Sequence, residues 1–316
     1  MPGVDAIMAA RRADSFAKRS IKGSSKQRAL RLAISMLDLT TLEGKDTPGK
    51  VRALCRKAIS PVDVPAGCLP PDPPVPHAAA VCVYPTMVAE AREALGDAPV
   101  KVAAVATGFP SGQYPLDVRL RDCADAIAAG ADEIDMVISR GLFLGGRDDE
   151  VMREVRETRA LCAHPPKGRP AHLKIILETG ELETLDNVRR ASDLAIEAAC
   201  SVPGLAAPVD GEVFIKTSTG KVQPAATMPV TLVMLEAIRD CFLHTGIRIG
   251  MKPAGGIRTS KQAIAYLVMV KETLGDEWLG PGLFRFGASA LANDLARQVL
   301  RMTSGRYAAA HDVTEA

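Results

Sequence analysis

Short apolar runs rich in β-branched residues alternate with Ala- and Leu-rich stretches of helical period along nearly all of this 316-residue chain. Continuous apolar strands of this kind are typical of a parallel sheet that helices cover. Eight candidate strands lie near Ile34–Thr40, Ala80–Tyr84, Val100–Thr107, Glu133–Ile138, Leu173–Glu178, Val213–Thr217, Arg248–Lys252 and Leu283–Gly287. Helices are expected between them, at Leu120–Ala129, Val151–Cys162, Thr184–Ala199, Pro229–Phe242 and Lys261–Leu274. This pattern predicts an α/β fold, a (β/α)8 or TIM barrel. A doubly wound open sheet is the rival, but the glycine-rich turn expected after its first strand is absent.

The barrel is expected to occupy residues 32–304, preceded by an N-terminal helical extension (1–31) and followed by a flexible C-terminal tail (305–316). Three Pro/Gly-rich stretches each precede a predicted strand, at 60–76, 163–171 and 201–211. They therefore belong at the amino-terminal ends of the strands, the barrel face remote from chemistry. We interpret them as tolerated loop variation.

Composition narrows the class of protein. The formal net charge of +2 gives no general electrostatic case for binding nucleic acid or a membrane. No apolar run approaches the roughly 18 residues of a membrane span. Seven scattered cysteines without a Cys-x-x-Cys pair argue against a disulfide framework or a zinc site, and favour a reducing, cytoplasmic compartment. We interpret the basic segment Arg11–Arg31 as a solvated helical face, with an organelle-targeting segment as the alternative.

Polar residues recur at the carboxyl ends of the predicted strands, where barrel enzymes build their sites. They include Asp38, Thr40, Cys82, Thr107, Asp135, Glu178, Lys216, Thr217, Lys252 and Ser289. None of the five histidines falls at such an end, which disfavours a zinc-dependent aldolase or a Ser-His triad. For Cys82, without a histidine partner, we favour a lining role over that of a nucleophile. No metal and no organic cofactor is expected.

Two lysines end neighbouring strands, Lys216 the sixth and Lys252 the seventh. A cation beside an amine disfavours its protonation, as does an apolar wall, and a neutral lysine is a nucleophile toward carbonyls. This pair therefore predicts Schiff-base chemistry at Lys216. Asp135, between bulky apolar neighbours, is costly unless paired, so we expect it to bridge to Lys252 and to move protons. Asp38 has a similar setting, with helix capping as its alternative role.

Small residues follow the last three strands, at Thr217–Lys221, Gly255–Arg258 and Gly287–Ser289. Such residues let backbone N–H groups approach an anion, and Lys221 and Arg258 add charge. Barrels often bind phosphate with the loops after strands seven and eight, so a phosphate site is expected here. The spacing of a P-loop is absent.

The same residues resemble the deoxyribose-phosphate aldolase family, from about Leu32 to Leu300. The matching stretches are Leu37–Leu42, Val81–Pro85, Glu133–Val137, Leu177–Leu182, Phe214–Lys221, Met251–Arg258 and Arg285–Ser289. The resemblance implies a class I, metal-free aldolase that reversibly cleaves 2-deoxy-D-ribose 5-phosphate to acetaldehyde and D-glyceraldehyde 3-phosphate, in deoxyribonucleotide catabolism. It also implies that the protein binds a small-molecule substrate and that it assembles into a homodimer or homotetramer.

The resemblance assigns the Schiff base to Lys216, its tuning to Lys252, and a water-linked proton relay to Asp135 with Asp38 nearby. The residues expected to hold substrate and its phosphate are Thr40, Cys82, Thr217, Gly220, Lys221, Gly255, Gly256, Arg258, Gly287 and Ser289. The family usually has a second hydroxyl residue after Ser289, where this chain has Ala290. Two alternatives remain: another Schiff-base aldolase or transaldolase acting on a sugar phosphate, and a barrel that only binds a sugar phosphate.

Overall fold

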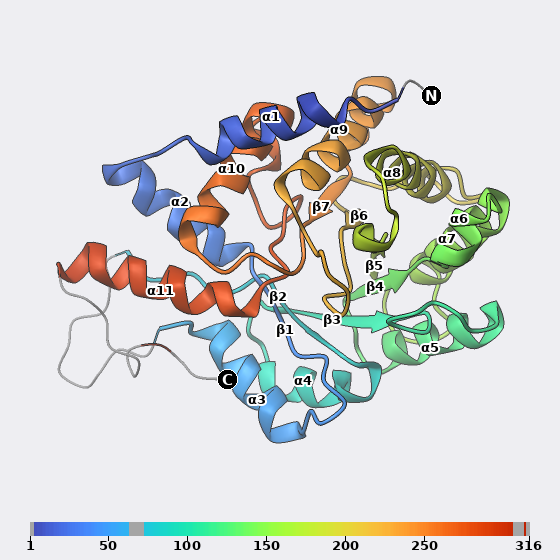
Figure 1. Ribbon diagram of the computed structural model, residues 1–316. Coiled ribbons are helices and arrows are strands. Elements are labelled where there is room, and N and C mark those ends of the chain that lie inside the picture. The colour runs from blue at the N-terminus through green and yellow to red at the C-terminus, as the bar shows by residue number, and fades with distance from the viewer. Residues whose placement is uncertain (1–2, 63–72, 306–312, 314–316) are drawn as a thin grey trace.

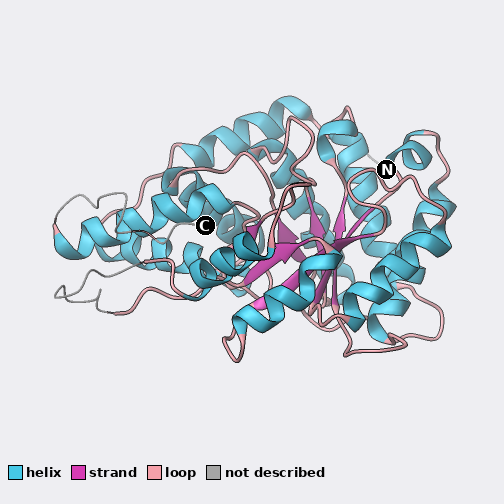
Figure 2. Ribbon diagram, turned by 90° about the horizontal axis from the view of Figure 1, so that it is seen from below, coloured by secondary structure: helices cyan, strands magenta, loops and turns pink. Residues whose placement is uncertain are grey.

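The computed structural model describes residues 3–62, 73–305 and 313. Within them one sheet runs in chain order, and every neighbouring pair of its strands is parallel. Its strands are β1 (Asp38–Thr40), β2 (Ala80–Val83), β3 (Lys101–Ala106), β4 (Glu133–Val137), β5 (His172–Ile176), β6 (Val213–Lys216) and β7 (Gly250–Lys252). The strands lie at the centre of the molecule and helices surround them (Figure 1, Figure 2).

The predicted eighth strand is present as a short segment that closes the sheet. Phe284 forms a parallel bridge with Met251 of β7, and Phe286 forms one with Leu37, just before β1. The Arg285 N–H donates to the Met251 carbonyl at 3.0 Å, and the Asp38 N–H donates to the Phe286 carbonyl at 2.9 Å. The segment thus bonds to both edges of the sheet, and the predicted α/β barrel is confirmed.

The helices follow the strands as the periodicity predicts. The helices of the barrel are α3 (Pro48–Ile59), α4 (Val88–Leu95), α5 (Leu116–Ala128), α6 (Arg140–Leu144), α7 (Asp148–Ala163), α8 (Leu185–Cys200), α9 (Met228–Thr245), α10 (Ser260–Leu274) and α11 (Ser289–Ser304). Short 3-10 turns lie at Pro85–Met87, Thr179–Glu181 and Asp276–Trp278. Threonine side chains cap the first turns of four of these helices, at Thr47, Thr184, Thr227 and Thr259. Such caps satisfy backbone N–H groups that have no partner inside the helix.

One predicted boundary is wrong. The first strand was expected from Ile34, but Ile34 lies in α2 (Gly23–Ser35), and β1 begins at Asp38. Leu30, Ala33 and Ile34 are buried at helical spacing, so the apolar run belongs to the inner face of a helix. A short apolar run does not by itself distinguish a buried helix end from a strand.

The N-terminal residues form two helices on the outside of the barrel. α1 (Ala6–Ala17) contacts α9 and α10, and α2 contacts α10 and α11 (Figure 1). Arg12 and Arg19 pair with Glu236 of α9 and Glu272 of α10. Part of the basic segment therefore serves to attach α1 to the helical layer. None of the described helices combines the length and apolar character that crossing a bilayer requires.

Of the three predicted inserts, 163–171 and 201–211 connect α7 to β5 and α8 to β6, at the amino-terminal ends of those strands. Most of the insert at 60–76 and of the tail at 305–316 lies outside the described residues. The domain limits at 31/32 and 304/305 stay predictions, and α2 runs across the first of them.

Packing of α1 gives a first prediction. The Phe16 ring is buried against the barrel, whereas Ile7 on the same helix is 66% exposed. We expect Phe16→Ala to lower the free energy of unfolding by about 3 kcal/mol, because truncation leaves a cavity in a packed interface. Ile7→Ala is the matched control and should change it by less than about 0.5 kcal/mol. Urea denaturation measures both, and equal small effects would show that α1 adds little to stability.

Candidate active site

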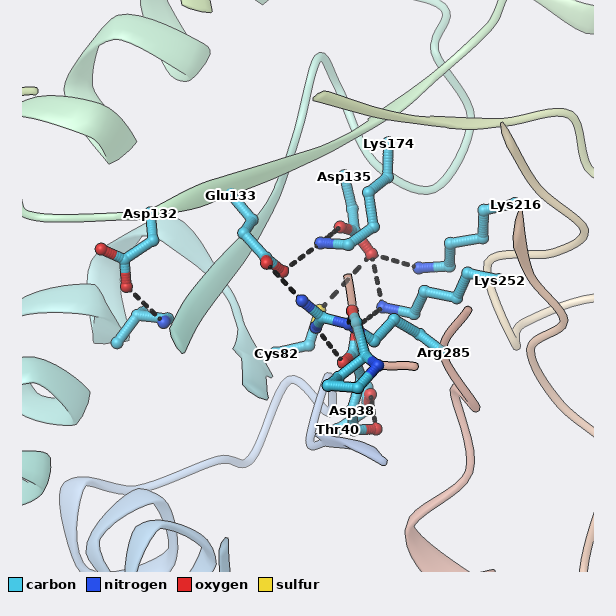
Figure 3. A network of polar contacts seen from close by, with 12 residues as sticks. Asp38, Thr40, Cys82, Asp132, Glu133, Asp135, Lys174, Lys216, Lys252 and Arg285 are labelled. Atoms are coloured by element: carbon cyan, nitrogen blue, oxygen red, sulfur yellow. Dashed lines mark hydrogen bonds and ion pairs between the residues drawn. The ribbon is translucent and has the colours of Figure 1, made fainter. Parts of the chain in front are cut away.

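Two lysines and two carboxylates meet inside the barrel (Figure 3): Lys216 and Lys252 end β6 and β7, whereas Asp38 begins β1 and Asp135 lies in the middle of β4. Lys216 Nζ donates to Asp135 Oδ2 at 2.7 Å. Lys252 Nζ donates to the same oxygen at 2.9 Å and lies 2.7 Å from Asp38 Oδ2. One carboxylate oxygen therefore contacts both ammonium groups, in an interior where all four side chains are almost fully buried.

The strand register and one glycine explain how the two lysines fit side by side. Lys216 and Lys252 are directly paired across β6 and β7, so their side chains leave the sheet on the same face. A Cβ at Gly287 would lie 2.7 Å from the Ala254 Cβ and 3.2 Å from the Lys252 Cε. Glycine at 287 therefore provides the room that the Lys252 stem occupies.

A second group of charges surrounds these four, and sequence reasoning missed it. Lys174 Nζ donates to Asp135 Oδ1 at 3.0 Å and also to the Glu133 carboxylate. The Arg285 guanidinium donates to Glu133 Oε1 at 2.9 Å and to Asp38 Oδ1 at 2.8 Å. Opposite charges thus alternate across the barrel interior, as Figure 3 shows. Breaking one member of such a buried network is costly, because its partner is left uncompensated.

A sequence signal for this group did exist. Glu133 precedes Asp135 by two residues, so both project to one face of β4. Lys174 interrupts the apolar run Leu173–Ile176, and Arg285 lies between two buried phenylalanines. Charged residues inside the apolar strands of a barrel therefore indicate charged groups in the barrel interior, in addition to those at its mouth.

The surroundings drive the two lysine pKa values apart. Burial lowers the pKa of Lys216 below its ordinary value; Asp135 opposes this shift, and the neighbouring Lys252 cation adds to it. Burial would lower the pKa of Lys252 as well, but Asp135 and Asp38 raise it well above the ordinary value. Lys216 is therefore the lysine closer to neutrality, and Lys252 remains a cation. A pair of like groups with opposed pKa shifts is a common way to divide acid and base roles.

The carboxylates of the cluster stay ionised. Burial would raise the pKa of Asp135, but Lys174, Lys216 and Lys252 together hold it well below its usual range. The pKa of Asp38 is also lowered, because Lys252 and Arg285 outweigh its burial. Asp38 does not cap a helix here, since it lies in β1.

Three further predicted residues lie around this cluster. The Cys82 Sγ is 3.9 Å from Asp135 Oδ2, and burial raises the pKa of this thiol to about 11, so the thiol stays protonated at neutral pH. The Thr217 Oγ1 accepts from the Ala254 N–H at 2.9 Å and connects the ends of β6 and β7. The Thr40 N–H donates to Ser289 Oγ at 2.7 Å, which joins the end of β1 to the start of α11.

A cavity of about 280 Å³ at the mouth brings together Thr40, Gly220, Lys221 and Ser289, four of the residues expected to hold substrate and phosphate. Lys221 Nζ donates to Glu43 Oε1 at 2.8 Å. The loop that carries Gly220 and Lys221 is held by Glu178, which the sequence analysis placed at a strand end without giving it a role. The Glu178 carboxylate accepts from the Thr219 N–H at 3.2 Å.

The other expected phosphate residues do not line this cavity. The Gly255 N–H donates to the Gly287 carbonyl at 3.1 Å, and the Gly287 N–H donates to the Pro253 carbonyl at 2.9 Å. Both amides thus take part in closing the barrel. Gly256 lines a separate cavity next to α1 and α10. The Arg258 side chain is exposed, and its backbone N–H donates to Gln262 at the start of α10.

Together the barrel and this cluster define an enzyme of the lysine-dependent aldolase class. A family model described as "DeoC/LacD family aldolase" matches residues 32–296. The chain therefore belongs to the DeoC/LacD family of aldolases.

Named relatives agree with this assignment. The chain is 47% identical over 300 residues to a protein named deoxyribose-phosphate aldolase from Mus musculus, covering 94% of this chain and 89% of the relative. It is 46% identical over 308 residues to the Homo sapiens protein of the same name, covering 96% and 91%. Among solved structures, a putative deoxyribose-phosphate aldolase from Toxoplasma gondii superimposes with a TM-score of 0.71 at 24% identity, covering 90% of this chain and 98% of that one. The structural likeness, at this identity, concerns the fold.

Proposed function

We propose that this aldolase reversibly cleaves 2-deoxy-D-ribose 5-phosphate to acetaldehyde and D-glyceraldehyde 3-phosphate, with Lys216 as the Schiff-base residue. The observation that carries the proposal is the pair of buried lysines sharing one oxygen of Asp135, at 2.7 and 2.9 Å. The identity of the proposed substrate is taken from the names of the relatives, which are deoxyribose-phosphate aldolases. A barrel that only binds a sugar phosphate is not favoured, since the relatives are named as aldolases.

In the cleavage direction, the neutral Lys216 amine attacks the aldehyde carbon of the open-chain sugar. Loss of water from the carbinolamine gives a protonated imine. Removal of the proton from the C3 hydroxyl then breaks the C2–C3 bond, and the electron pair moves into an enamine. Glyceraldehyde 3-phosphate leaves, the enamine takes up a proton at C2, and hydrolysis releases acetaldehyde.

We assign the proton transfers to Asp135 and Lys252, working through water. Contact of Asp135 Oδ2 with both ammonium groups supports this relay. Asp38 is a positioning residue in this scheme, because its Oδ2 lies 2.7 Å from Lys252 Nζ and helps to keep that lysine charged. The lowered pKa of Lys216 supports its role as the nucleophile.

The phosphate is proposed to bind at the mouth cavity, with Gly220, Lys221 and Ser289 in contact. Thr40, Cys82 and Thr217 are proposed to line the path from this cavity to Lys216. The loops that border the phosphate site are proposed to be those that carry Gly255, Gly256, Arg258 and Gly287. The departure at Ala290 concerns only one phosphate or loop contact.

We further propose a reducing, cytoplasmic setting and assembly into a homodimer or homotetramer. The six described cysteines are free thiols, which supports the first point. A protein of similar fold, deoxyribose phosphate aldolase from Aeropyrum pernix, is described as having a unique tetrameric structure, which supports the proposal of a homo-oligomer.

Borohydride trapping tests the function directly. We expect incubation with acetaldehyde and then borohydride to leave a two-carbon adduct on Lys216, identified by peptide mass spectrometry. The same protein should release acetaldehyde from 2-deoxyribose 5-phosphate. Absence of an adduct on any lysine of the folded protein would contradict the Schiff-base proposal, and an adduct without cleavage would point to another Schiff-base aldolase.

A further inference from the structure

The ladder of backbone hydrogen bonds between β5 and β6 changes its step directly beyond Lys216. In a regular parallel ladder, the donors on one strand and the acceptors on the other advance together, every second residue. The Leu177 N–H donates to the Lys216 carbonyl at 3.0 Å, but the following bond joins the Thr179 N–H to the Thr217 carbonyl at 2.9 Å. The β5 side thus advances by two residues and the β6 side by one, so Glu178 is an extra residue, as in a β-bulge. Such extra residues re-aim side chains and are common next to active sites.

Glu178 carries two energetic costs at this position. Its backbone is in the left-handed region, with φ 53° and ψ 60°, which residues other than glycine rarely adopt. Its side chain is fully buried, and the donors that it contacts are the neutral N–H and hydroxyl of Thr219. Burial raises the pKa of the Glu178 carboxyl, although the hydrogen bonds from Thr219 oppose this shift. Strained residues persist where the surrounding structure fixes them, and they cluster at active sites.

The contacts of Glu178 fix the loop that follows β6. Both carboxylate oxygens accept from the Thr219 N–H at 3.2 Å, and Oε2 also accepts from the Thr219 hydroxyl. Thr219 Oγ1 in turn accepts from the Lys221 N–H at 3.0 Å. Beside these bonds the two loops pack without free space, since a Cβ at Gly180 would lie 2.2 Å from the Pro224 carbonyl oxygen. The loop after β5 therefore determines the path of the loop after β6.

The loop that Glu178 fixes begins at the proposed nucleophile. Lys216 is the last residue of β6, and Thr219 follows it by three residues. We propose that Glu178 is a positioning residue of the aldolase reaction: by holding Thr219 it fixes the end of β6, and so keeps the Lys216 amine in its place beside Asp135, 2.7 Å from Oδ2. A displacement of a reacting group by about 1 Å can lower a rate by about two orders of magnitude. This inference rests on the proposed function.

The kinetics of Glu178→Gln test the inference. Glutamine keeps the volume of the side chain but loses its charge and one acceptor. We expect kcat for 2-deoxyribose 5-phosphate to fall by about tenfold, with KM changed by less than about threefold. The initial rate at which acetaldehyde and borohydride label Lys216 should fall by a similar factor. Because acetaldehyde carries no phosphate, this second measurement reports on the nucleophile alone.

The matched control is Glu183→Gln. Glu183 lies in the same loop and also has a positive φ, of 68°, but its side chain is exposed. This substitution should leave kcat and the labelling rate unchanged. A merely structural role of Glu178 would change the free energy of unfolding and not the labelling rate of the folded protein. An unchanged labelling rate in folded Glu178→Gln would therefore overturn the inference, as would an effect on KM alone.

A double-mutant cycle tests whether Glu178 acts through Thr219. Thr219→Val removes the hydroxyl, and the double variant should lose no more rate than the more impaired single variant, because both substitutions break one contact. Thr219→Ser keeps the hydroxyl and should retain most of the wild-type rate. Additive losses would contradict the inference. If Glu178→Gln does not fold, equal rates in Thr219→Val and Thr219→Ser would contradict it instead.

The wild-type protein separates this inference from the proposed function. Absence of a two-carbon label on Lys216 of the folded wild type would contradict the proposed function. Labelling and cleavage by the wild type, with the same rates in Glu178→Gln and Thr219→Val, would contradict the inference alone.

Discussion

Replacing Lys216 by alanine is expected to lower kcat for 2-deoxyribose 5-phosphate by at least about four orders of magnitude, because the covalent route is lost with the nucleophile. The fold should survive. Lys216 shares Asp135 with Lys174 and Lys252, which continue to balance the charge of that carboxylate after the substitution. Measurement of acetaldehyde release, with circular dichroism to confirm folding, checks both statements.

The control for this experiment is a lysine outside the site. Lys101→Ala, at the exposed start of β3 on the opposite face of the barrel, should retain the wild-type kcat. Borohydride trapping should label Lys216 in this control and find no two-carbon adduct in Lys216→Ala. Substantial turnover by Lys216→Ala would mean that another residue is the nucleophile.

Replacing Lys252 by leucine is expected to reduce kcat by about two to four orders of magnitude, because a group that transfers protons is removed. The pH dependence should change as well. Lys252 is one of the causes that lower the pKa of Lys216, so its loss lets that pKa rise. The reactive form of Lys216 is the neutral amine, which is populated above its pKa. The acid limb of kcat/KM should therefore move to higher pH.

A pH profile of kcat/KM for Lys252→Leu, set beside the wild type and Lys101→Leu, measures this shift. Loss of rate without movement of the acid limb would show that Lys252 acts only in proton transfer. An unchanged rate would show that the two lysines are not coupled at all. The adduct on Lys216 should still form with acetaldehyde, but more slowly at neutral pH.

Burial of charge is the unusual feature of this barrel. Asp38, Glu133, Asp135, Lys174, Lys252 and Arg285 are all at most 6% exposed, in the part of the molecule where apolar side chains usually gather. Desolvation makes each charge costly unless it is paired. The alternation of acids and bases around Asp135 supplies that pairing, and it also keeps Asp135 and Lys252 ionised beside a less basic Lys216. The same contacts therefore stabilise the interior and divide the roles of the two lysines.

The sequence by itself was sufficient for the barrel and for the central residues of the candidate site. Apolar periodicity identified all eight strand segments, because buried parallel strands are apolar on both faces. Lys216, Lys252, Asp135 and Asp38 could be placed together because the carboxyl ends of parallel strands meet at one mouth. The start of the first strand was missed, since the apolar face of α2 has the same local pattern as a strand.

Only the tertiary structure decided what depends on strand register and on the paths of loops. The register of β4 and β5 determines that Lys174 meets both Asp135 and Glu133, and the closing segment brings Arg285 to Asp38. Loop paths determine that Arg258 lies exposed while Lys57 of α3 lines the mouth cavity. Spacing along a strand determines on which face of the sheet a side chain lies. The residue that it contacts lies on another segment, far away in the sequence, and the local sequence pattern does not identify that residue. The sequence therefore indicated the chemistry of this site, and the packing of distant segments determined its electrostatics.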